Sequence, residues 1–170
     1  MMLAKQKIIV IDYGSQYTQL IARRIREQQI FCEVYPFNKI NLKIITDSTI
    51  SGIILSGGPS SVKDKNSPKL DNKILDLNIP ILGICYGLQL IAKIFGGSIK
   101  SSKKRREFGR ALIYKKKNSL LTKNFFNKDK NSVWMSHQDS VYKLPKGFTR
   151  IASTAQSAMT IIENKKKKIY

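Results

Sequence analysis

Four short apolar runs set the plan of the first half of the chain. Each holds several β-branched or leucine residues in close succession and is bounded by polar, glycine or proline residues; the runs are Lys7–Asp12, Ile30–Tyr35, Ser51–Ser56 and Ile81–Ile84. Near-continuous apolar runs of this length are typical of parallel strands buried on both faces of a sheet. Segments with helical spacing separate them. The pattern therefore predicts a doubly wound α/β fold, with a mostly parallel sheet and helices on both faces.

The helical segments differ in strength. One opens at residues 15–18 and continues with an apolar and a charged face, and Ser15 stands where it could cap the start. Residues 40–46 and 70–77 carry weaker helical patterns. A further helix follows Ile84 and ends at Gly96-Gly97, because paired glycines favour termination.

The second half of the chain changes character. Short segments of strand-like alternation are separated by loops rich in lysine, asparagine, glycine and proline; they are 98–100, 111–114, 133–136, 148–153 and 159–163. Period-two alternation predicts strands with one buried face.

Length and composition indicate one globular domain that covers residues 1–170. With 42% hydrophobic residues, the chain can build a real core. There is no apolar run long enough for a membrane span and no signal-peptide pattern, so we expect no membrane partner. Cys32 and Cys85 are far apart in the sequence and read as reduced thiols of a cytoplasmic protein. Cys32 lies in an apolar run and is interpreted as strand packing.

The net charge of +20 raises the possibility of a nucleic-acid partner. The basic residues, however, are 24 lysines and only 7 arginines, and the lysines are scattered along the chain. Base recognition relies on the planar fork of arginine. We therefore expect a solvated basic surface, with no specific nucleic-acid site and weak, salt-sensitive adsorption to polyanions.

Cys85 is the strongest candidate for chemistry. It stands between a buried strand and a helix, with Gly83 and Gly87 two positions to either side. Glycines at these positions relieve the crowding of a tight strand-to-helix turn, as in a nucleophile elbow. The positive end of the helix dipole should favour the reactive thiolate. A small buried hydrophobe is the alternative for a free cysteine, but Gln89, one helical turn later, would place an amide beside the thiol and favours a polar substrate.

A second candidate is the loop at Gly57-Gly58-Pro59, which follows the third apolar run. Glycines expose backbone N–H groups, and such a loop at a strand's carboxyl end can hold an anion or a developing oxyanion. An ordinary glycine turn is the alternative.

Together, Gly-Ile-Cys-Tyr-Gly-Leu-Gln at 83–89 and Ser-Gly-Gly-Pro at 56–59 resemble the nucleophile and oxyanion motifs of class I glutamine amidotransferases, whose fold is flavodoxin-like. This resemblance implies that the strands of the second half form an antiparallel extension of the central sheet. Two further stretches, Asp12–Tyr17 and Arg106–Gly109, resemble the GMP synthase family within that class. The resemblance implies that Cys85 attacks the side-chain amide of glutamine, forms a thioester and releases ammonia, which aminates XMP to GMP. It also implies that the N–H groups of Gly58 and Tyr86 form the oxyanion hole.

The resemblance further implies a glutamine pocket lined by Gly57, Gln89, Ser136 and His137. Although His137 is the only histidine in the chain, the family's general base is a different histidine. Gln138 stands where the family has glycine, a departure that bears on the geometry of the pocket. The glutaminase step needs no metal or cofactor; ATP and Mg²⁺ belong to the ATP-pyrophosphatase half, which is implied as a partner in the same or a separate chain.

The family's base lies in a Gly-x-Gln-x-His-Pro-Glu motif, which does not occur in the 170 residues. We therefore expect a glutamine amidotransferase domain that is incomplete at its C-terminus and has little activity by itself. Two alternatives stay open. One is the glutaminase subunit of another synthase, such as anthranilate synthase; the other is a non-catalytic remnant or binding module.

Overall fold

A computed structural model describes residues 6–101 and 107–170, and it divides into two compact units. The first unit runs to Leu90 and includes Lys166–Ile169. The second contains Ile91–Lys165 and Tyr170. Arg106, part of one motif named above, lies outside the described residues.

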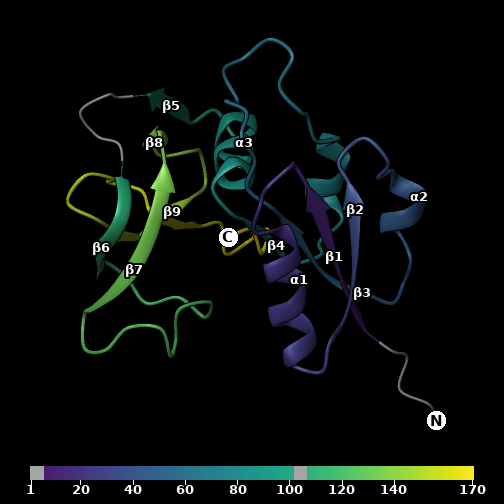
Figure 1. Cartoon of the computed structure of the whole chain (residues 1–170), viewed down its shortest axis with the longest axis horizontal. Coiled ribbons are helices and arrows are strands. Elements are labelled where there is room, and N and C mark those ends of the chain that lie inside the picture. Colours follow the sequence, from purple (N-terminus) through teal and green to yellow (C-terminus); the bar gives the residue numbers. More distant parts are fainter. Residues whose placement is uncertain (1–5, 102–106) are drawn as a thin grey trace. The chain divides into compact units, whose positions relative to one another are not determined.

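The first unit is built on a four-stranded parallel sheet with the order β2-β1-β3-β4 (Figure 1). The strands are β1 (Lys7–Asp12), β2 (Phe31–Pro36), β3 (Ile50–Leu55) and β4 (Ile81–Gly83). Val10 of β1 lies beside Val34 of β2 and Ile54 of β3. The predicted parallel sheet is confirmed. Because the strands all run the same way, their carboxyl ends, including the residues that follow Leu55 and Gly83, meet at one edge.

Helices connect the strands, as expected: α1 (Thr18–Glu27), α2 (Leu42–Ile45), the 3₁₀ helix η1 (Asn72–Asp76) and α3 (Tyr86–Ile94). Ala22 of α1 packs with Val10 and Cys32 in a buried cluster, so α1 covers one face of the sheet. Cys32 is 2% exposed, which confirms its interpretation as strand packing. The prediction that Ser15 caps α1 is wrong: the capping position is Tyr17, and the Ser15 hydroxyl accepts only from the Tyr17 N–H at 3.1 Å.

The chain returns to the first unit near its end. The Ile81 N–H donates to the Lys168 carbonyl at 3.0 Å, and Ile169 forms a parallel bridge with Ile81. Ile169 is completely buried, and Lys167 pairs with Asp76 at 2.8 Å. The edge of β4 is thus partly covered by residues from the far end of the sequence.

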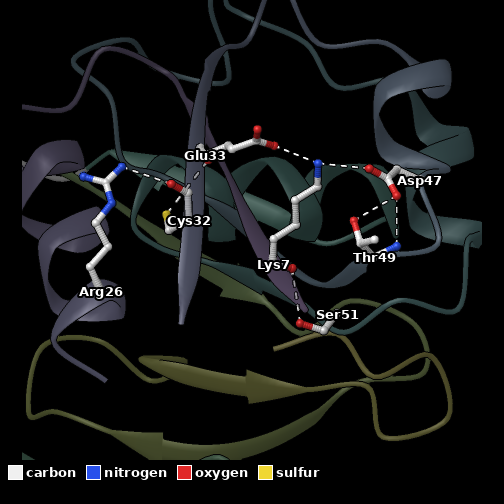
Figure 2. Close-up of polar contacts among 7 residues, drawn as sticks. All are labelled: Lys7, Arg26, Cys32, Glu33, Asp47, Thr49 and Ser51. Carbon is white, nitrogen blue, oxygen red and sulfur yellow. Dashed lines mark hydrogen bonds and ion pairs between the residues drawn. The ribbon is translucent and has the colours of Figure 1, made fainter. Parts of the chain in front are cut away.

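An ion-pair network fastens the start of β1. The ammonium of Lys7 lies 2.9 Å from a Glu33 carboxylate oxygen on β2 and 3.0 Å from Asp47 in the turn before β3 (Figure 2). Thr49 donates to Asp47 through its backbone N–H and hydroxyl, at 2.9 and 2.8 Å. Two carboxylates raise the pKa of Lys7, and the Thr49 and Lys7 hydrogen bonds lower the pKa of Asp47 to about 2.

The second unit is antiparallel. One sheet has the order β10-β9-β6-β7 and the other pairs β5 with β8 (Figure 1). The strands are β5 (Ser98–Ser101), β6 (Glu107–Lys115), β7 (Lys130–His137), β8 (Asp139–Lys143), β9 (Thr149–Ser153) and β10 (Ile161–Glu163). The predicted antiparallel strands are confirmed, and β8 is an additional one. The prediction that these strands extend the central sheet is wrong: they pair with one another in two sheets of their own, and the free edge of β4 is bridged by Ile169 instead. Within the described residues, no helix is long and apolar enough to cross a membrane.

We predict that Asp47→Asn makes the chain less resistant to unfolding near neutral pH. Asparagine keeps an oxygen for Thr49 but loses the charge that faces Lys7. When folding lowers the pKa of a carboxyl group, its charged form stabilises the fold at pH values above its ordinary pKa of about 4. This stabilisation is lost as the pH falls toward 2. In denaturant titrations, the gap between the wild type and Asp47→Asn should therefore be clear at pH 6 and smaller at pH 3. An equal gap at both values would contradict the role of the charge. Asp76→Asn, at an exposed single pair, is the control for a general loss of negative charge.

Candidate active site

Cys85 occupies a sharp turn between β4 and α3, as predicted. Its φ is +50°, in the left-handed region that non-glycine residues rarely adopt. The turn is held against the end of β3: the Ile84 N–H donates to the Leu55 carbonyl at 2.9 Å, and the Gly87 N–H donates to the Ser56 carbonyl at 3.1 Å. A Cβ on Gly87 would overlap the Leu55 carbonyl oxygen and lie 2.7 Å from the Leu55 Cβ. Only glycine allows this approach, so backbone contacts fix the position of Cys85.

The structure favours the protonated form of the Cys85 thiol, whereas the sequence predicts that the thiolate is favoured. The residue is exposed, but the packing around the turn withdraws water from the sulfur and raises the pKa of Cys85 above its ordinary value. No charged side chain contributes to this shift. A thiol in such a setting is mostly protonated at neutral pH, and it needs a base before it can act as a nucleophile.

The loop after β3 lies next to the cysteine. A Cβ on Gly57 would be 3.6 Å from the Cys85 Cβ and 3.4 Å from the Ser15 hydroxyl oxygen, which are ordinary contact distances. Ser56, which is fully buried, stabilises the loop. Its hydroxyl accepts a hydrogen bond from the Tyr13 N–H at 3.0 Å and donates one to the Gly57 carbonyl at 2.8 Å. The two sequence candidates, the loop and the elbow, are therefore neighbours.

Tyr13 connects the loop with the elbow. A Cβ on Gly58 would lie 2.6 Å from the Tyr13 carbonyl oxygen, so the two backbones are in direct contact. The Tyr13 ring lies between the rings of Phe37 and Tyr86, with centroid distances of 5.8 and 5.1 Å. Burial raises the pKa of the Tyr13 phenol, whose oxygen has no hydrogen-bond partner among the described residues. One buried side chain thus touches both residues whose N–H groups were candidates for an oxyanion hole.

Tyr13 and Ser15 were missed as site residues by the sequence reasoning. Their stretch was noted only as a motif, although its place after a parallel strand already put it at the sheet edge where sites form. Asp12 shapes the stretch by accepting from the Gly14 N–H at 2.9 Å and the Thr18 hydroxyl at 2.7 Å.

The remaining predicted residues are placed differently. Gln89 lies on α3 one turn after Cys85, to whose carbonyl its N–H donates at 3.0 Å, but it is only 7% exposed. It belongs to the packed base of the elbow. Ser136 and His137 end β7, opposite Phe108 and Glu107 of β6, and lie in the second unit. The group that the structure brings together in the first unit is therefore Gly57, Gly58, Cys85, Tyr86 and Gln89. Among the residues that the structure describes, no cluster of three or more His, Cys, Asp or Glu side chains could hold a metal ion.

Residues 9–170 match the family model described as glutamine amidotransferase class-I. The chain is 50% identical over 163 residues to a GMP synthase [glutamine-hydrolyzing] of Prochlorococcus marinus (strain MIT 9312), covering 96% of this chain and 30% of that protein. It is 45% identical over 164 residues to the one of Brachyspira hyodysenteriae, covering 96% and 31%. The chain thus spans about 30% of the length of the curated relatives it matches.

Solved structures agree with these similarities. A Thermoplasma acidophilum protein assigned as a GMP synthase subunit superposes with a TM-score of 0.80 at 31% identity, over 98% of this chain and 81% of that chain. A glutamine amidotransferase of Thermotoga maritima superposes with a TM-score of 0.77 at 22% identity, over 97% and 73%, and supports the fold alone.

We predict that neighbouring glycines of the loop respond differently to alanine. Gly58→Ala drives a methyl group into the Tyr13 backbone and should lower the free energy of unfolding by about 1–3 kcal/mol, a usual cost of overpacking. Gly57→Ala meets only ordinary contacts and should cost less than about 1 kcal/mol. Urea unfolding of the two variants checks this pair. Equal losses would show that the close contact between Gly58 and Tyr13 is absent in solution.

A second prediction concerns the buried phenol. Tyr13→Phe removes the hydroxyl but keeps the ring between Phe37 and Tyr86, so the free energy of unfolding should stay the same or rise by about 1 kcal/mol. Tyr13→Leu loses the ring stacking and should lower it by about 1–3 kcal/mol. If Tyr13→Phe destabilised the chain as much as Tyr13→Leu, the hydroxyl would have a partner that the fold depends on.

Proposed function

The chain belongs to the class-I glutamine amidotransferases, and we propose from this membership that it is the glutaminase portion of a GMP synthase. The observation that carries the proposal is Cys85 at a strained strand-to-helix turn, beside a glycine loop. In the proposed reaction, the Cys85 sulfur attacks the side-chain amide carbon of glutamine. The amide nitrogen takes up the proton that the thiol loses and leaves as ammonia, and water then hydrolyses the thioester to glutamate and restores the Cys85 thiol.

The oxyanion that forms during the attack would be held by the N–H groups of Gly58 and Tyr86. Their shared contact with Tyr13 supports this role, because a donor fixed by packing needs no reorganisation when charge develops. One such donor contributes roughly 3–4 kcal/mol to transition-state stabilisation in other enzymes. Gly57, which lies beside Cys85, is proposed to line the glutamine pocket, with Gln89 in the packed base beneath it.

The raised pKa of Cys85 means that a base must take the thiol proton. The family's His-Pro-Glu motif does not occur in the 170 residues, so we propose that the described residues need a base from outside them for efficient turnover. The ammonia would be used by an ATP-pyrophosphatase portion, which binds ATP and Mg²⁺ and aminates XMP. No cofactor is proposed for the glutaminase step. Both cysteines are free, which fits a cytoplasmic location.

Two other functions compete with this one. A glutaminase for another synthase is disfavoured by the similarity to GMP synthases along 96% of the chain. A non-catalytic module is favoured by the raised pKa of Cys85 and by Gln138 in place of the family's glycine. Reactivity of Cys85 toward a glutamine-like reagent separates a glutaminase from a non-catalytic module.

We predict that a chloroketone analogue of glutamine alkylates Cys85 far faster than Cys32, which is 2% exposed. Excess glutamine should slow the labelling, and Cys85→Ser should abolish it. Because the pKa of Cys85 is raised, the thiolate fraction and the labelling rate should still be climbing above about pH 8.5, the ordinary value for cysteine. Mass spectrometry of the labelled peptides gives both rates. Equal labelling of the two cysteines, or no protection by glutamine, would contradict a glutamine site at Cys85.

A further inference from the structure

The exposed face of the β6–β7 hairpin is unusually apolar. The two strands pair along their whole length, with Phe108 opposite Ser136, Arg110 opposite Trp134 and Leu112 opposite Ser132 (Figure 1). Alternate residues share a face. One face therefore carries four large exposed side chains and two basic ones, together called the hairpin face: Phe108, Arg110, Leu112, Tyr114, Lys130 and Trp134.

A solvent-facing antiparallel face normally carries polar residues, because only the other face is needed for the core. Here the inner face already contributes to the core, since Ile113 is 2% exposed. Yet Trp134 is 82%, Phe108 60% and Leu112 47% exposed. Scattered single apolar residues need no explanation, but four of them on one face of two paired strands form a contiguous patch, which marks an interaction site.

The composition of the hairpin face fits a protein partner. Tryptophan, tyrosine and arginine dominate the energetics of protein interfaces, whereas lysine is depleted there. Although lysine outnumbers arginine 24 to 7 in the chain, the middle of the hairpin face holds Arg110. The Ser132 hydroxyl accepts from the Arg110 guanidinium at 2.7 Å. The ring of Trp134 comes within 3.8 Å of a Cβ position on Gly109, so the indole lies over a residue with no side chain.

The charge of the hairpin face restricts the partner further. The described side chains on it include two cations, Arg110 and Lys130, and no carboxylate. The carboxylate nearest its Tyr114–Lys130 end in sequence, Asp129, pairs with Lys115 at 2.8 Å. A second copy of this chain would bring like charges together on top of a net charge of +20. The complementary surface is therefore apolar and carries carboxylates opposite Arg110 and Lys130.

We propose that the hairpin face docks on the synthase portion of GMP synthase, at an apolar surface that carries acidic residues opposite Arg110 and Lys130. The proposal rests on the proposed function, because it takes this chain as the glutaminase portion. The GMP synthases it matches have about 70% of their length outside the matched region, so a large protein surface is available in them. Docking would cover the exposed apolar side chains and pair Arg110 with a carboxylate.

The test combines the full chain with the part of the Prochlorococcus marinus (strain MIT 9312) GMP synthase that lies outside the match, after cooperative unfolding has shown that this probe is folded. Trp134 is the only tryptophan of the chain, so 5-fluorotryptophan incorporation gives a single ¹⁹F signal on the hairpin face. We expect the signal to shift on titration with the probe. Trp134→Ser and Arg110→Glu should each weaken binding at least tenfold, measured by calorimetry.

One control variant and four contrary outcomes decide the proposal. Leu120→Ser removes an 80% exposed apolar side chain outside the hairpin face and should bind like the wild type. Absence of binding to the folded probe, or binding that both hairpin-face variants retain, overturns the proposal. Dimerisation of the chain in the absence of the probe also overturns the proposal. Tight binding of a single-stranded oligonucleotide by the wild type, but not by Trp134→Ser or Arg110→Glu, overturns it as well. Chloroketone labelling of Cys85 without the probe is followed in parallel. If Cys85 of the wild type is not labelled, the proposed function is wrong. If Cys85 is labelled but the chain does not bind the probe, only the proposed docking surface is wrong.

Discussion

The active-site geometry depends on one contact between two backbones, where the first turn of α3 meets the end of β3. The absence of a side chain on Gly87 lets the helix approach the Leu55 carbonyl, and this approach fixes the turn that carries Cys85. The same principle recurs at Gly58, which rests on the Tyr13 carbonyl. Two glycine contacts therefore place the nucleophile and the loop beside it. The strain at Cys85, with φ of +50°, is sustained because the N–H groups of Ile84 and Gly87, on either side of it, are hydrogen-bonded to the end of β3 and the residue after it.

Tyr13 shows how a buried side chain can matter to a site without pointing into it. Its ring supports Tyr86, its carbonyl supports Gly58, and its N–H is anchored to the buried hydroxyl of Ser56. A phenol oxygen without a partner among the described residues is a cost that a leucine or phenylalanine would avoid. The packing of the aromatic ring outweighs it.

Much of this arrangement could be predicted from the sequence. The run Lys7–Asp12 and the Gly-x-Cys-x-Gly turn predicted buried parallel strands and an elbow, because local patterns govern both. The contacts of Tyr13 could not be predicted, since they join residues from three loops that only the folded sheet brings together. The raised pKa of Cys85 could not be predicted for a similar reason. A sequence pattern indicates a helix and its dipole, whereas the removal of water from the Cys85 sulfur depends on tertiary packing. The pairing of Ile169 with Ile81 and the apolar hairpin face of β6–β7 likewise depend on the tertiary fold.

The bridge between Ile169 and Ile81 has a consequence for synthesis in the cell. A ribosome completes β1 to β4 by Gly83, but more than 80 further residues must be translated before Ile169 emerges. At about 5–20 residues per second, the nascent parallel sheet waits on the order of ten seconds with the β4 edge uncovered. An open strand edge is a template for aggregation during that interval. Chaperone binding to the nascent chain would be most valuable in this interval, which lasts until Ile169 reaches β4.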